Sequence, residues 1–157
     1  MRHKKTVKRQ IEVDRVYQSQ LVAKFINTIM KDGKKTTAEK ILYDTFDLLA
    51  KDKNNPLEIF EKAVLNVGPR QEVKARRVGG ASYQVPIEVR GDRRTSLAIR
   101  WIIEAARARS NKDFHLFSEK LAAEILNAFK GEGQAVKKKD TMQRMADANR
   151  AFSHFRF

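Results

Sequence analysis

Residues that interrupt helices are scarce in this chain: glycine and proline together fill only ten of its 157 positions. Because these two residues are the strongest breakers of regular structure, their scarcity leaves room for long helices. Apolar residues also recur at the spacing of one helical face, three or four positions apart. The pattern predicts six helices, at about 19–33, 36–49, 56–67, 92–109, 117–130 and from 134 onward.

Local signals mark where several of these helices begin and end. Gly33 is placed to end the first helix, and Thr36 with Glu39 has the spacing of a capping box that opens the second. Asn55 followed by Pro56 opens the third, because proline is favoured at the first helical position. The third helix is expected to stop at Gly68 and to bury Leu57, Phe60, Val64 and Leu65.

The helix expected at 92–109 is apolar around most of its circumference. At about 100° per residue, aliphatic and tryptophan side chains cover all but one narrow stripe. The stripe consists of Arg93, Ser96, Arg100, Glu104 and Arg107. A helix of this kind is mostly buried, so we expect it to show only this row of arginines to the outside.

Between the third and fourth helices the period changes from helical to alternating. Residues 73–78 and 83–89 read as strands, and Gly79 with Gly80 between them is a hairpin turn signal. Pro86 cannot donate to a strand ladder, which favours an edge strand or a free ribbon. A lone two-stranded ribbon is marginal in water. We therefore expect this ribbon, at about 72–90, to gain its order by lying on something else.

The predicted fold class is mainly α: a single domain of six helices, with a protruding two-stranded β-ribbon between helices three and four and a basic N-terminal arm. The arm spans 1–11 and the helical domain 12–157. The net charge of +14 is uneven, because 12–69 holds as many acidic as basic groups, whereas the arm, 70–94 and 95–157 are all basic. A compact chain this basic points to a polyanionic partner.

Signals for chemistry are weak. The chain has no cysteine, which excludes disulfides, thiolate metal sites and cysteine nucleophiles. Its histidines, His3, His115 and His154, have no metal-ligand spacing, and no phosphate-binding glycine loop is present. We expect no enzyme: no catalytic residue, no metal, no cofactor and no small-molecule substrate. No apolar run approaches the roughly 20 residues that cross a bilayer, and no signal peptide is visible, so we expect no membrane contact.

Signals for nucleic-acid binding are stronger. The arm is too polar to pack and is typical of segments that order on a phosphate backbone. Arg76 and Arg77 share the ribbon with Tyr83, whose ring can stack on a base. Lys34 and Lys35 lie at the turn between two helices. These features together favour nucleic acid over an ordinary solvated basic surface, while a DNA-architectural protein and an enzyme acting on RNA stay as alternatives.

Several blocks of sequence stand out together: SQLVAKFI at 19–26, GKK at 33–35, NVGP at 66–69, VKARRVGGASYQVP at 73–86, RWIIEAAR at 100–107, AVKKK at 135–139 and RMADANRAF at 144–152. They run in order over nearly the whole chain and resemble the family of the seventh protein of the small ribosomal subunit, bacterial or plastid type. The resemblance implies a structural constituent of that subunit, a primary binder of 16S rRNA that nucleates assembly of the head (the 3′ major domain).

The resemblance also implies partners and contact residues. The partners are 16S rRNA, the exit-site tRNA and the ninth and eleventh small-subunit proteins, in the cytoplasm, with an organellar ribosome left open. By matching position, rRNA contacts are expected at Arg2, His3, Lys4, Lys5, Lys8, Arg9, Lys34, Lys35, Arg76, Arg77, Arg93, Arg94, Lys137, Lys138 and Lys139. We add the basic residues Arg70, Arg100, Arg107, Arg109 and Arg144. Contacts with tRNA or a neighbouring protein are expected at Val78, Gly79, Gly80, Ala81, Ser82, Tyr83 and Arg150.

Overall fold

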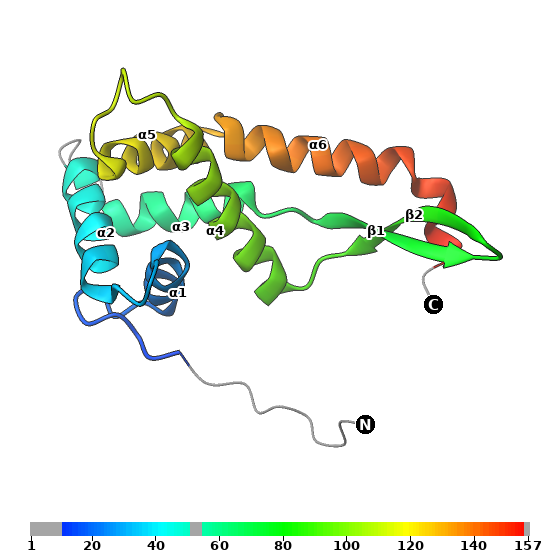
Figure 1. Ribbon diagram of the computed structural model, residues 1–157, viewed down its shortest axis with the longest axis horizontal. Helices are drawn as coiled ribbons and strands as arrows, with labels where there is room; N and C mark the ends of the chain where they lie inside the picture. The colour runs from blue at the N-terminus through cyan, green and yellow to red at the C-terminus, as the bar shows by residue number, and fades with distance from the viewer. Residues whose placement is uncertain (1–10, 51–54, 156–157) are drawn as a thin grey trace.

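The computed structural model describes residues 11–50 and 55–155, which form a helical body with a long extension (Figure 1). The elements are α1 (Gln20–Ile29), α2 (Lys35–Ala50), α3 (Pro56–Val67), β1 (Gln71–Val78), β2 (Ala81–Glu88), α4 (Gly91–Ala108), α5 (Phe117–Lys130), α6 (Gln134–Ala148) and the 3₁₀ helix η1 (Arg150–Phe155). Helices α1 to α5 make the body, and the ribbon and α6 extend from it side by side. The predicted mainly α class, with its ribbon between helices three and four, is confirmed.

The core draws one large, fully buried side chain from each helix of the body: Phe25, Phe46, Phe60, Ile102 and Ile125. The ring of Phe60 lies at its centre, with centroids 5.0 Å from Phe25, edge to face, and 5.5 Å from Phe46. Edge-to-face aromatic pairs are favourable beyond the apolar area that they bury. The core therefore fixes the five helices relative to one another.

The first two helices begin and end differently from the sequence prediction. Helix α1 ends at Ile29, because Met30 already has an extended ψ of 133°. The turn that follows contains Asp32 and Gly33, both with positive φ, at 53° and 72°. Helix α2 then begins at Lys35, so Thr36 lies inside its first turn and the predicted capping box is wrong. The connection between the two helices is consequently longer and more open than expected.

The boundaries of α3 follow the sequence signals. The side chain of Asn55 accepts a hydrogen bond from the backbone N–H of Leu57 at 3.1 Å, Pro56 occupies the first turn, and Gly68 follows the last helical residue. The prediction that Leu65 belongs to the core is wrong, since it is 63% exposed. Its neighbour Val64 is buried, as predicted. Only one side of α3 packs on the core, so the next position along the helix faces solvent.

Both strands begin two residues earlier than predicted, at Gln71 and Ala81, the second ends one residue earlier, at Glu88, and the turn lies where predicted. Val78 pairs with Ala81 across Gly79 and Gly80, whose φ values are 56° and 90°. Two consecutive positive φ angles define the hairpin turn that matches the natural twist of paired strands. Glycine adopts them without the penalty that a Cβ brings.

The ribbon was expected to gain its order by lying on something else, and two other elements of the same chain pack against it. Helix α6 runs beside β1, and η1 lies across β2 (Figure 1). The ring of Tyr83 on β2 lies 5.2 Å from the rings of both Phe152 and Phe155 on η1. We call these three residues the aromatic clasp. It gives a ribbon that would be marginal alone an apolar contact near its tip.

Glu124 on α5 connects three elements of the body. Its carboxylate is completely buried and accepts hydrogen bonds from the Arg109 guanidinium at 2.7 and 2.9 Å and from the backbone N–H of Ala135 at 3.1 Å. A buried charge is tolerated when it is paired and fully hydrogen-bonded. Glu124 thus ties the residue after α4 to the first turn of α6.

A second network fixes the start of the described chain. The buried Asp14 accepts a hydrogen bond from the hydroxyl of Tyr43 at 2.8 Å and from the backbone N–H groups of Val16 and Tyr17 at 3.1 and 3.0 Å. Burial, followed by the hydrogen bond to Asp14, raises the pKa of Tyr43 to about 12. The network therefore holds residues 14–17 against α2.

We expect Glu124→Ala to lower the free energy of unfolding by about 3 kcal/mol, because it removes the partner of a mostly buried arginine. Chemical denaturation followed by circular dichroism measures the loss. Glu61, an exposed carboxylate on α3, provides the matched control, and Glu61→Ala should change stability by less than about 0.5 kcal/mol. Equal losses in the two variants would contradict the role given to Glu124.

We expect the double variant Phe152→Ala, Phe155→Ala to loosen the ribbon without affecting the body. Aromatic pairs contribute about 0.5–1.5 kcal/mol each, so amide exchange in β2 should accelerate about tenfold or more. Hydrogen exchange read by mass spectrometry compares β2 with α1 to α5, and Met145→Ala, an exposed position on α6, serves as control. Unchanged exchange in β2 would show that the clasp does not order the ribbon.

Candidate nucleic-acid interface

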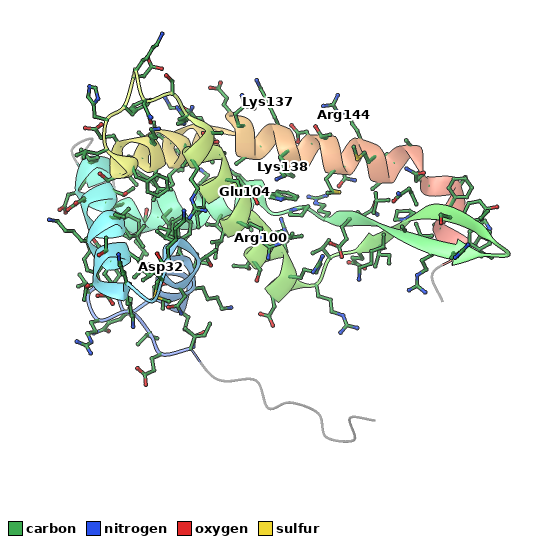
Figure 2. All side chains as sticks on the ribbon, in the orientation of Figure 1. Asp32, Arg100, Glu104, Lys137, Lys138 and Arg144 are labelled. Atoms are coloured by element: carbon green, nitrogen blue, oxygen red, sulfur yellow. The ribbon has the colours of Figure 1, made fainter. Side chains whose placement is uncertain are left out.

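The arginine row predicted on the fourth helix is confirmed on α4. Its members Arg93, Ser96, Arg100, Glu104 and Arg107 are all exposed. Buried residues such as Ile102 cover the opposite side of the helix. Figure 2 shows Arg100 and Glu104 on successive turns of α4. The row is therefore available to a partner, although its members differ in what they contact within the protein.

Arg93 pairs with Glu72 at the base of the ribbon. The guanidinium donates to both carboxylate oxygens at 2.7–2.8 Å, and Glu72 is only 7% exposed. The hydrogen bonds and then the charge of Glu72 raise the pKa of Arg93. Because Glu72 lies on β1 and Arg93 in the first turn of α4, this pair fixes the ribbon against the helical body.

Arg94 and Lys139 satisfy backbone carbonyls at the end of α3. Arg94 Nε donates to the carbonyl of Gly68 at 3.1 Å, and Lys139 Nζ donates to the carbonyl of Asn66 at 3.2 Å. The last carbonyls of a helix have no partner within it, and positive charge near them is favourable. These two cations from α4 and α6 therefore position three helices relative to one another.

Three other predicted contact residues also have partners inside the protein. Lys138 on α6 forms an ion pair with Glu104 on α4 and lies 5.8 Å from the centroid of the Trp101 ring. Arg109 is held by Glu124. Lys35 lies 3.8 Å from Glu39, one turn away on an exposed part of α2. Their contact with RNA stays a prediction, as it does for Arg93, Arg94 and Lys139.

The remaining predicted cations are exposed, except Arg76, which is half-buried, and we call this set the outward cations. Within 11–50 and 55–155 no ion pair or side-chain hydrogen bond is found for Lys34, Arg70, Arg76, Arg77, Arg100, Arg107, Lys137 or Arg150. Arg144 donates only to the carbonyl of Asp140 in its own helix, at 3.4 Å. These outward cations are the groups that the structure leaves able to neutralise phosphates.

Six of the outward cations fall into three groups, and Arg70, Arg100 and Arg150 lie outside them. The turn group comprises Lys34 and Arg107, together with Lys31; all three side chains line one pocket. The ribbon group comprises Arg76 and Arg77, neighbours on β1 whose side chains point to opposite faces of the ribbon. The helix group comprises Lys137 and Arg144, which Figure 2 shows on the outer side of α6. The helical body and its extension thus hold three separate cationic surfaces.

The other predicted contacts lie at the tip of the ribbon or outside the described residues. The ring of Tyr83 is half-buried in the aromatic clasp, so base stacking by this residue would compete with its own neighbours. The turn at Gly79 and Gly80 is exposed at the tip of the ribbon, as are Ala81 and Ser82. Arg2, His3, Lys4, Lys5, Lys8 and Arg9 lie outside the described residues.

Sequence reasoning missed two residues of this interface. Lys31 belongs to the turn group, and the two lysines that follow Gly33 are the only signal in the sequence that could have pointed to it. Glu72 anchors Arg93, and no spacing rule predicts a pair that joins a strand to a helix across 21 residues.

Within the part of the chain that the structure describes, no three or more histidine or acidic side chains gather where they could hold a metal ion. None of the described helices combines the length and the hydropathy that a bilayer span requires.

Comparison with known proteins gives matches along the whole chain. Residues 1–150 match the family described as ribosomal protein S7p/S5e. Proteins named small ribosomal subunit protein uS7 from Thermotoga petrophila and Thermotoga maritima are each 56% identical over 158 residues, covering 100% of both chains. The protein of the same name from Desulfatibacillum aliphaticivorans is 52% identical over 157 residues, covering 99% of both chains.

Proposed function

Because the chain belongs to the ribosomal protein S7p/S5e family, and is therefore an rRNA-binding structural constituent of the small ribosomal subunit, we propose that it is a primary binder of 16S rRNA that nucleates assembly of the head. Its place is the small ribosomal subunit, which in bacteria is cytoplasmic. Proteins of this family are in general structural rather than enzymatic. Its mechanism on RNA is accordingly electrostatics and shape rather than bond chemistry.

The observation that carries the proposal is the separation of the three cationic surfaces on one fold. The turn group lies on the helical body, while the ribbon group lies on the extension, at the other end of the molecule in Figure 1. Contacts with phosphates position a protein on RNA without reading its sequence. A protein that grips RNA at both ends holds separate RNA helices in one geometry, which is what nucleating a folded domain requires.

In this proposal the outward cations neutralise phosphates, and the paired cations hold the surfaces in place. Arg93, Arg94, Arg109, Lys138 and Lys139 contact other elements of the fold. They contribute to binding chiefly by fixing the ribbon, α4 and α6, and any further contact with rRNA uses donors that these pairs leave free. The arm at 1–11 adds five basic groups to this charge.

We further propose that the ribbon tip, residues 78–83, and Arg150 face the exit-site tRNA or a neighbouring protein, the ninth or eleventh of the small subunit. Supporting this, the small side chains and backbone at Gly79, Gly80 and Ala81 are exposed. The tip also projects beyond the helical body (Figure 1). A surface with little bulk of its own lets a partner's backbone approach closely.

Charge reversal on the ribbon tests the proposal. We expect Arg76→Glu with Arg77→Glu to weaken binding to the 3′ major domain of 16S rRNA at least tenfold at moderate salt, and to reduce the slope of log K against log salt by about one to two units. Filter binding over a salt series gives both numbers. Lys40→Glu with Lys62→Glu, at exposed positions of α2 and α3 outside the three surfaces, makes the same change in charge and should have a much smaller effect.

Removal of the arm gives an independent test. Deleting residues 1–10 removes five basic groups, so the salt slope should fall by up to about four units and affinity at moderate salt should fall with it. The melting temperature of the free protein should stay nearly unchanged. Unchanged affinity would show that the arm does not bind RNA. A large fall in melting temperature would show that the arm also stabilises the fold.

A further inference from the structure

The turn group surrounds a pocket that the family assignment does not explain. A cavity of about 450 Å³ opens between the turn joining α1 and α2, the end of α4 and the start of α5. Its floor is apolar and is made by Ile29, Ala38, Ile41 and Phe117. Pockets that hold small organic ligands have volumes of about 300–1,000 Å³ and mostly apolar walls. The cavity is therefore large enough for a nucleotide-sized group.

The rim of the pocket is cationic. Lys31 and Lys34 come from the turn and Arg107 from the last turn of α4, and all three are exposed. Within 11–50 and 55–155 no ion pair is found for any of these three side chains. Asp32 is the only acidic residue of the lining. The pocket thus combines an apolar floor with an excess of positive charge at its mouth.

The early end of α1 creates this space. A helix that continued to Gly33 would have placed residues 30–33 on its last turn rather than in the connection that lines the pocket. Met30 instead leaves the helix in an extended conformation, and the positive φ of Asp32 and Gly33 turns the chain toward α2. The connection between α1 and α2, which differs from the sequence prediction, therefore supplies part of the wall of the pocket.

We propose that this pocket binds one unpaired nucleotide of the ribosomal RNA. The planar base enters the apolar floor beside Phe117, and the phosphates on either side meet Lys31, Lys34 and Arg107. Proteins commonly recognise RNA through unstacked bases that they hold against aromatic and apolar side chains. An apolar side chain of a neighbouring protein could fill the same floor, but it would leave the three cations without anionic partners.

The inference rests on rRNA binding by the chain, and its test uses a variant that fills the pocket without changing charge. Thr37 is exposed on the first turn of α2 and lines the pocket, whereas the adjacent, exposed Thr36 does not. We expect Thr37→Trp to weaken rRNA binding about tenfold or more, because it removes the stacking of the base in the pocket. Thr36→Trp, the matched control, should bind like the unaltered protein.

Chemical probing of the RNA locates the nucleotide. The unaltered full-length protein, bound to the 3′ major domain and to whole 16S rRNA, should protect the base-pairing edge of one unpaired nucleotide. Thr37→Trp should lose that protection while keeping protections elsewhere. Removing that base from the RNA should weaken binding of the unaltered protein by the same factor, with little further effect on Thr37→Trp, since coupled changes are not additive.

A second variant keeps the test independent of how well tryptophan is accommodated. Lys31→Gln with Arg107→Gln changes two exposed side chains and leaves the floor intact, and it too should weaken the protection. If both variants protect the same bases as the unaltered protein, the pocket holds no nucleotide and the inference is overturned. Binding to whole 16S rRNA but not to the 3′ major domain would overturn the proposed head site alone, and binding to neither RNA would overturn both.

Discussion

A chain with a net charge of +14 must place its cations where they do not oppose folding. Self-repulsion of this kind destabilises a compact state, and the structure divides the charge into two uses. One set of cations lies between elements: Arg93 on Glu72, Arg94 on the end of α3, and Arg109 on Glu124. The other set is outward and separated over three surfaces. The first set fixes the ribbon, α4 and α6 against the helical body, and the second is the set that we propose to bind RNA.

The accuracy of sequence prediction depended on how local the signals were. The boundaries of α3 and the ribbon turn follow from neighbouring residues such as Asn55 and Gly79, whose backbone preferences act over a few positions. The connection between α1 and α2 was predicted wrongly, because glycine at 33 marks a turn but not the residue at which the helix stops. Periodicity assigned Leu65 to the core, although only packing against other helices decides which side of α3 is covered.

The candidate interface was likewise predictable where the signal is local in sequence and unpredictable where it depends on tertiary packing. Composition and charge runs located the basic segments, and the stripe on α4 was predicted residue by residue from helical geometry. Which cations are engaged inside the protein could not be predicted, because partners such as Lys139 and Asn66 lie 73 residues apart. That Arg107 lies beside Lys31 and Lys34 could not be predicted either, because tertiary packing alone brings them to one pocket.

The aromatic clasp has a consequence for the order in which the protein matures. Translation produces Tyr83 well before Phe152 and Phe155, so the hairpin leaves the exit tunnel without the rings that later hold it. The helical bundle can condense during that interval, because its buried side chains lie upstream of α6 for the most part. A nascent chain would thus acquire its globular portion first and a stiff hairpin last, which delays full competence for docking until the polypeptide has been made through η1.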